Sequence, residues 1–227
     1  MTITLERRAT PHPIEFRAAP DEAGGLGVLA GYAVVFDSES RDLGGWVETI
    51  DPTAFGEALD DGMLDLERHH RVIARSEHDS RSLLGTTDAG TLRLFIDDTG
   101  IRYEVDLPDT TAGRDAAVLA ERGDYSFSSF AFYSLPGGAE WRENTQGQLV
   151  RHVTAAQLVD VAPVADPAYW GSTTELQRSF DLDQIRADLR SEKPAESEAA
   201  PDARAAVLGR AITIRNTIER GRHGYRD

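Results

Sequence analysis

Residues 122–133 read RGDYSFSSFAFY, and this stretch predicts a strand. Beyond its Arg-Gly-Asp opening it alternates aromatic and small residues, which is typical of a buried strand. Such a strand normally carries Val, Ile or Phe, because a buried hydroxyl without a partner is costly. The serines are therefore either solvent-side and turn positions, or one of them has a chemical role.

The period-two repeat of a strand sorts these residues onto two faces. One face carries Tyr125, Phe127, Ser129, Ala131 and Tyr133, and the other carries Ser126, Ser128, Phe130 and Phe132. Ser129 is central, and the small Ala131 leaves room beside its hydroxyl. Ser129 could simply bond a neighbouring carbonyl, which residue chemistry alone favours, or it could be a nucleophile with a base beside it.

Short strands surround this stretch and predict a mainly β fold. We expect strands at residues 26–36, 46–50, 64–75, 91–98 and 100–107, one near Trp141, and a long one at 149–161. Helices are expected after Asp51-Pro52 and over residues 110–123, with Asp109 as the cap of the second. Many short strands with few helices favour an α+β fold built on a closed β-barrel over βαβ repeats.

The composition changes along the chain and predicts five segments. They are a flexible N-terminal arm (1–25), the main domain (26–172), an amphipathic helix (173–190), an acidic linker (191–202) and a basic C-terminal helix (203–227). The last segment is expected to dock on the domain or, alternatively, to act as a partner-binding or removable tail.

Overall composition excludes several functional classes. The 227 residues include no cysteine and have a formal net charge of −15, which excludes thiolate chemistry and argues against a general nucleic-acid binder. No apolar run is long enough to span a membrane. The first residues lack the apolar segment of a signal peptide, so secretion by that route is not expected.

The six histidines differ in their surroundings. His78 precedes Asp79 between two apolar strands, where a side chain can face a cleft, whereas His152 opens a strand. The remaining histidines are expected in tails or on the surface: His12, His69, His70 and His223. An alternative is a metal site built from His70, His78 and a carboxylate. The sequence has no HExxH-like spacing that would support it.

If Ser129 is a nucleophile, it needs a base, and the base needs an orienting group. The chain supplies His78 as the base and either His152 or Asp160 as the orienting group. Sequence neighbours alone do not show that these side chains meet.

Six segments, taken in order, resemble the tailed-phage prohead maturation proteases, which are serine peptidases related to the herpesvirus assemblins. The segments cover about residues 28–172 and read GYAVVFDSES, GGWVETIDPTAF, SEHDSRSLLGTT, TLRLFIDDTGIRYEVDLPDTTAGRD, RGDYSFSSFAFY and VDVAPVADPAY. The third is similar to the family's Asn-His-Asp segment, the fifth to a strand that ends in Ser-Phe-Gly-Phe, and the last to Glu-Val-Ser-Pro-Val-x-x-Pro-Ala-Tyr.

The resemblance implies a β-barrel protease without a cofactor or metal, in which Ser129 is the nucleophile and His78 the general base. His152 is the first choice for the third member, because its distance from Ser129 along the chain is close to that in assemblins, and Asp160 is the alternative. The chain departs from the family pattern at Glu77, Ala131, Ala155 and Gln157, where the family has Asn, Gly and, at the last two, often acids.

The implied function is proteolytic maturation of the procapsid within the bacterial host cytoplasm. The expected substrates are the scaffolding region of the major capsid protein and the protease itself, cut in the linker at 191–202. The portal is a further expected partner, and a homodimer is expected from the assemblin relationship. The alternative reading is an inactive capsid-assembly factor that retains the protease fold.

Overall fold

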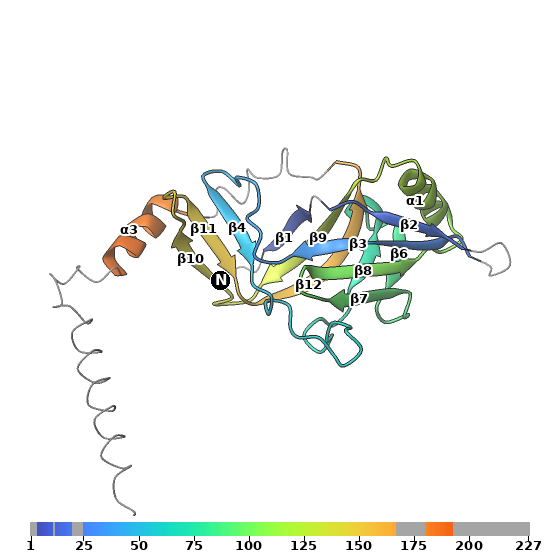
Figure 1. Ribbon diagram of the computed structural model, residues 1–227, viewed down its shortest axis with the longest axis horizontal. Coiled ribbons are helices and arrows are strands. Elements are labelled where there is room, and N and C mark those ends of the chain that lie inside the picture. The colour runs from blue at the N-terminus through green and yellow to red at the C-terminus, as the bar shows by residue number, and fades with distance from the viewer. Residues whose placement is uncertain (1–3, 11, 20–24, 167–179, 193–227) are drawn as a thin grey trace, which may run out of the picture. The chain divides into compact units, whose positions relative to one another are not determined.

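The structure is a computed structural model that describes residues 4–10, 12–19, 25–166 and 180–192 (Figure 1). Its helical elements are α1 (Thr111–Glu121), α3 (Leu182–Glu192) and the short 3-10 turn η1 (Ser76–His78). The strands are β1 (Leu5–Thr10), β2 (Glu15–Ala18), β3 (Gly27–Val35), β4 (Trp46–Ile50), β5 (Ile73–Arg75), β6 (Leu83–Thr86), β7 (Leu92–Ile96), β8 (Gly100–Asp106), β9 (Phe127–Ser134), β10 (Ala139–Glu143), β11 (Leu149–Val153) and β12 (Ala156–Val164).

These strands form three sheets, each with two open edges. A five-stranded sheet has the order β1-β9-β12-β5-β6, a four-stranded sheet has the order β2-β3-β8-β7, and a three-stranded sheet has the order β10-β11-β4. The expectation of a mainly β, α+β fold is met. The closed barrel is not found among the described residues, because none of the three sheets pairs its first strand with its last.

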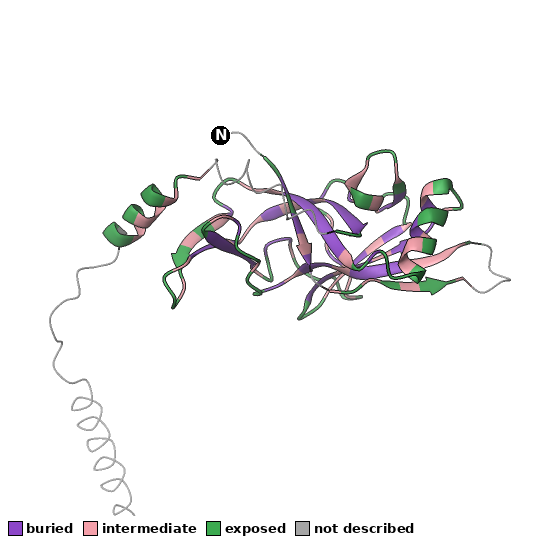
Figure 2. Cartoon of the chain, turned by 90° about the horizontal axis from the view of Figure 1, so that it is seen from above, coloured by how far each residue is buried: buried purple, intermediate pink, exposed green. Residues whose placement is uncertain are grey.

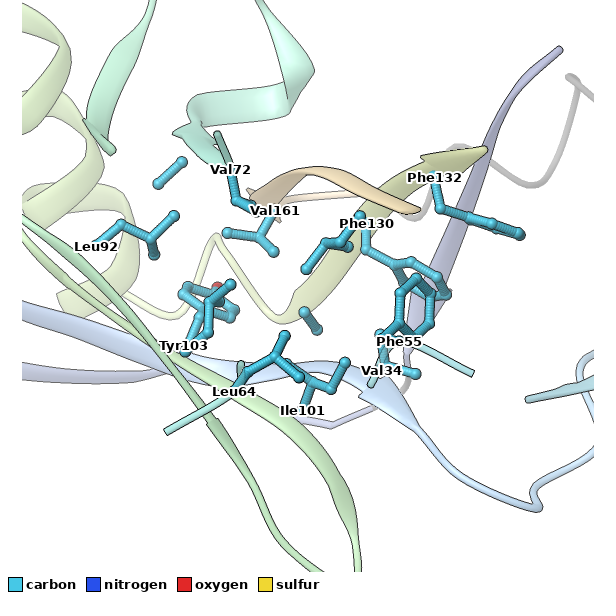
Figure 3. Packing of buried hydrophobic residues seen from close by; sticks show 14 of the residues in the cluster. Val34, Phe55, Leu64, Val72, Leu92, Ile101, Tyr103, Phe130, Phe132 and Val161 are labelled. Atoms are coloured by element: carbon cyan, nitrogen blue, oxygen red, sulfur yellow. The ribbon is translucent and has the colours of Figure 1, made fainter. Parts of the chain in front are cut away.

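The hydrophobic core contains residues from both the four-stranded and the five-stranded sheet. β3, β8 and β7 contribute Val34, Tyr103 and Leu92, while β9 and β12 contribute Phe130 and Val161 (Figure 3). Buried positions follow the strands of this region, whereas α1 carries its exposed residues on an outer face (Figure 2). β9, which contains most of the stretch 122–133, contributes to this core and pairs with β1 on one side and β12 on the other.

The N-terminal segment differs from the expected flexible arm. Residues 5–10 form β1, which pairs antiparallel with β9, and residues 15–18 form β2, which pairs antiparallel with β3. β1 alternates buried Glu6, Arg8 and Thr10 with more exposed residues. This pattern was obscured in the sequence because the buried positions are polar, whereas a strand is usually recognised by buried apolar residues.

Buried ion pairs anchor β1 to the three-stranded sheet. The Arg8 guanidinium lies 2.6 Å from Glu48 and 2.7 Å from Glu6, and Arg151 lies 2.7 Å from each of these carboxylates. All four residues are no more than 6 % exposed. Each buried charge therefore has partners of opposite sign, which is the condition for placing ions in a protein interior.

Three further expectations about local structure need correction. The segment after Asp51-Pro52 forms turns instead of a helix, with the Asp51 side chain accepting hydrogen bonds from the Thr53 amide and hydroxyl. The strand expected at 149–161 is divided into β11 and β12, which belong to different sheets. α1 forms as expected, but its cap is Thr110, whose side chain accepts from the Gly113 amide.

The C-terminal segments lie mostly outside the described residues. α3 occupies part of the expected amphipathic helix, whereas the expected basic helix at 203–227 and the linker beyond Glu192 lie outside the description. Contacts divide the chain into two units, residues 1–186 and 187–227. Within the described ranges, neither helix is both long and apolar enough to cross a membrane.

The Glu6 carboxylate should make the free energy of unfolding depend on pH in the acid range. Burial raises the pKa of Glu6, but the hydrogen bond and charge of Arg151, with the charge of Arg8, outweigh it and hold the pKa below 4.5. As the pH falls, the Glu6 carboxylate is therefore protonated first in the unfolded chain. The stabilisation is complete above about pH 4.5 and is lost as the pH falls through the lower pKa that Glu6 has in the folded protein.

Glu6→Gln should lower the free energy of unfolding at pH 7 by about 3 kcal/mol, because it leaves buried guanidinium groups with one carboxylate fewer. The variant should also lose less stability than wild type between pH 5 and pH 3. Denaturant unfolding at several pH values measures both effects, with the exposed Glu140→Gln as the control. An unchanged stability at pH 7 would contradict a structural role for this ion cluster.

Candidate active site

β9 places the Ser129 side chain among groups from three other elements. The residue is 1 % exposed, and its backbone lies opposite Ala9 of β1 and Ala162 of β12. Its hydroxyl lies 2.7 Å from the His78 Nε2 and 2.9 Å from the Arg8 carbonyl, and each of these acceptors can take its one proton. The hydroxyl is thus satisfied, and one of its partners is an imidazole that can accept a proton.

A sharp turn after β5 delivers His78. Both Glu77 and His78 have positive φ, at 53° and 56°, a conformation that costs energy for residues other than glycine. The turn is held by the Asp79 amide bonded to the Ser76 carbonyl, and by Glu77, whose carboxylate accepts from the Ala165 amide at 2.8 Å. The rare backbone conformation is thereby fixed, and it directs the His78 ring toward β9 and β12.

A bulge in β12 sets the orientation of Asp160. Leu158 pairs with Phe132, but Asp160 pairs with Ala131 instead of Phe130, so one extra residue lies between the two pairs. Because strand faces alternate, the bulge moves Asp160 to the face that carries Ser129. The small side chain of Ala131 directly opposite leaves space for the carboxylate.

Ser129, His78 and Asp160 form one continuous chain of hydrogen bonds. The Asp160 carboxylate lies 2.5 Å from the His78 Nδ1, while the His78 Nε2 faces the Ser129 hydroxyl. A carboxylate at Nδ1 holds the proton on that nitrogen and leaves Nε2 free to accept one. This arrangement can remove the proton of the serine hydroxyl and stabilise the imidazolium that results.

The Asp160 carboxylate has a second partner of opposite charge. Its other oxygen lies 3.2 Å from the Arg75 guanidinium, and Asp160 itself is 1 % exposed. Arg75 therefore compensates a carboxylate that is nearly excluded from water. Sequence reasoning missed Arg75. Its position two residues before Glu77 on a short strand gave no signal, because the contact depends on the parallel pairing of β5 with β12.

His152 lies in another sheet, away from this hydrogen-bond chain. On β11, its Nδ1 contacts the Thr49 hydroxyl at 2.9 Å and its Nε2 lies 3.3 Å from the Asp51 carboxylate. Thr53 and, to a smaller extent, His152 hold the pKa of Asp51 below its ordinary value. The structure thus brings Asp160, and not His152, to His78.

His69 and His70 lie in different environments. His69 is fully buried, contrary to the expected surface role: its Nδ1 accepts from the Leu158 amide at 3.0 Å and its Nε2 lies 2.5 Å from the Phe55 carbonyl. Burial lowers the pKa of His69 and outweighs the Phe55 carbonyl, which raises it. His70 is exposed. Among the described residues, no three His, Asp or Glu side chains gather as a metal site.

The other serines of the opening stretch have separate partners. Ser128 faces the opposite side of β9, where its hydroxyl lies 3.2 Å from that of the buried Tyr103. Ser126 is exposed and donates to the Gly123 carbonyl. Burial raises the pKa of Tyr103, so its hydroxyl stays protonated and available for this contact. Neither serine approaches a histidine in the contacts of the structure, which leaves Ser129 as the serine with a base beside it.

Comparison with known families identifies the family of the chain. The family model of the caudovirus prohead serine protease matches residues 13–186, which include Ser129, His78 and Asp160. No curated protein and no solved structure matches the chain significantly. The family match extends over well more than half of the sequence, and the chain therefore belongs to the caudovirus prohead serine proteases.

Proposed function

We propose that this protein is a serine endopeptidase in which Ser129 attacks, His78 transfers protons and Asp160 orients His78. The observation that carries the proposal is the hydrogen-bond chain from the Asp160 carboxylate through both nitrogens of His78 to the Ser129 hydroxyl. Membership of a serine protease family supports the same reading.

The reaction follows from the roles of these atoms. As the Ser129 Oγ forms a bond to the substrate carbonyl carbon, its proton passes to the His78 Nε2. The tetrahedral intermediate collapses when the C–N bond breaks, and His78 gives that proton to the leaving amine. Water then attacks the acyl-enzyme with His78 again as base, which releases the acid and restores the serine.

Asp160 replaces His152 as our choice for the third member. Its carboxylate occupies the position beside the His78 Nδ1, and its charge becomes more favourable as the imidazolium forms. His152 already contacts Thr49 and Asp51 through its two ring nitrogens. Family membership implies a role in capsid maturation within the host cell, where a prohead protease acts on the procapsid.

The finer proposals concern the substrates. We infer that the protease cleaves the scaffolding region of the major capsid protein and also its own linker at residues 191–202. The linker is acidic and rich in Ala, Pro and Ser, so cleavage there would require no unfolding of a packed domain. The portal and a second copy of the chain are further proposed partners.

Co-expression with the major capsid protein tests these proposals. We expect new capsid-protein termini at the end of its scaffolding region, and a protease shortened within 191–202. Mass spectrometry of the termini measures both products. The Ser129→Ala control should leave both chains intact, and equal processing by wild type and this variant would contradict the assignment of Ser129.

A further inference from the structure

Ser129 is covered in a way that a working nucleophile is not. It is 1 % exposed, and the His78 side chain is 5 % exposed. The cover on one side is β1, which pairs with β9 along its whole length and sets Ala9 directly opposite Ser129. In this register the Arg8 carbonyl lies beside the Ser129 hydroxyl, so a peptide bond that approaches from that side must displace β1.

β1 also competes for the proton of the nucleophile. A serine hydroxyl has one proton, and two acceptors compete for it here: the His78 Nε2 at 2.7 Å and the Arg8 carbonyl at 2.9 Å. Whenever the proton is donated to the Arg8 carbonyl, it is not available to His78. A main-chain carbonyl from a paired strand thus occupies the place beside Ser129 that a substrate carbonyl needs.

The anchoring of β1 differs from that of a core strand. Its inward side chains are Glu6, Arg8 and Thr10, and its outward Leu5 is 37 % exposed. Charged groups regain hydration when they leave an ion cluster, whereas apolar groups lose burial, so a strand held by charges is easier to release. β1 is also an edge strand with β9 as its neighbour in the sheet.

The family match begins at residue 13, after β1 has ended. Arg8 and Thr10 of β1 also border a pocket, which they line together with Val35, Ile50 and Phe130. Because Arg8 pairs with Phe130 and Ala9 pairs with Ser129, these pocket residues lie on the face of β9 opposite to Ser129. An extended peptide in the place of β1 would direct alternate side chains toward this pocket.

We propose that β1 is a substrate-like inhibitory strand and that β9 is the strand on which substrate binds. An extended segment of the substrate replaces β1, pairs antiparallel with β9 and brings its own carbonyl to Ser129. The inference rests on the proposed serine endopeptidase function and adds its substrate class, a strand-forming segment, together with its regulation by the N-terminus.

A reversible cross-link tests the proposal in the full-length chain. Leu5 and Tyr133 are cross-strand partners at the far end of β1 from Ser129. Such partners lie roughly 4.5–5.5 Å apart between Cα atoms, within the range of a disulfide. The chain has no other cysteine, so L5C/Y133C can form one bond only. Fluorophosphonate labelling of Ser129 should be roughly tenfold or more slower in the oxidised protein than in the reduced protein.

A disulfide between β2 and β3 provides the matched control. Arg17 and Val28 are also cross-strand partners, and R17C/V28C leaves β1 unpinned. Its labelling rate should be the same in both redox states. Equal labelling of oxidised and reduced L5C/Y133C overturns the inhibitory role of β1 but leaves the enzyme assignment intact. Absence of labelling in every protein, reduced forms included, contradicts the proposed function and the inference that rests on it.

A second variant answers the same question if the cross-linked protein fails to fold. Arg8→Ala removes the guanidinium that binds Glu48 but keeps the backbone carbonyl, so β1 should leave more often and labelling should rise roughly tenfold. Arg7→Ala is its control, because Arg7 is an exposed residue of the same strand. Equal rates in the two variants would contradict release of β1 as the limiting step.

Discussion

Asp160→Asn should lower kcat for peptide cleavage by about 10⁴-fold, whereas His152→Gln should leave it close to wild type. An asparagine keeps the size of the side chain but offers no negative charge beside the His78 Nδ1. The ring can then adopt the tautomer that carries its proton on Nε2, the nitrogen that must accept from Ser129. The loss should appear in kcat, because the interaction grows as the imidazolium forms.

The comparison of the two variants assigns the third member of the triad. Steady-state cleavage of a peptide from a mapped processing site gives kcat and KM for each protein, and thermal unfolding shows whether each remains folded. His152→Gln is a fair control because His152 also lies between strands and also contacts a carboxylate. A large loss in His152→Gln together with near-normal Asp160→Asn would reverse the assignment.

His78→Ala should abolish cleavage almost as completely as Ser129→Ala, by about 10⁶-fold in kcat. The base and the nucleophile act in one step, since the nitrogen within hydrogen-bond distance of the Ser129 hydroxyl is the His78 Nε2. Their effects should therefore not add: the double variant should retain the same residual rate as either single variant.

The same peptide assay, run with the two single variants and the double variant, measures this non-additivity. His70→Ala is the matched control, because His70 is exposed and eight residues from His78 in the sequence. A double variant that is much slower than both single variants would show that Ser129 and His78 act independently, against the hydrogen bond that joins them.

Period two placed Ser129 centrally on a strand, and β9 is that strand, but residue chemistry alone favoured a structural serine. The roles of Ser129 and His78 were predicted from the resemblance to the prohead proteases, which left the third member open. Asp160 remained an alternative to His152, because the face of a strand residue is known only when bulges are known. A bulge between Leu158 and Asp160 determines this face, and its neighbouring residues gave no sequence signal.

Tertiary pairing also explains the other differences. β1 was expected as part of a flexible arm, because its buried side chains are Glu6 and Arg8 and their partners lie far along the chain. The closed barrel was expected from the number of short strands, but strand number does not determine which edges pair. Residues 149–161 were predicted as one strand, whereas Thr154 and Ala155 separate β11 from β12, which belong to different sheets.

Fluorophosphonate labelling, with the modified peptide mapped by mass spectrometry, tests the central claim most directly. The assay should be run at high protein concentration, with capsid protein present, on wild type, Arg8→Ala, Ser129→Ala and His78→Ala. We predict an adduct on Ser129 in the first two proteins, none in Ser129→Ala and a much slower reaction in His78→Ala. A failure to modify Ser129 in both wild type and Arg8→Ala would contradict the assignment of this residue as an activated nucleophile.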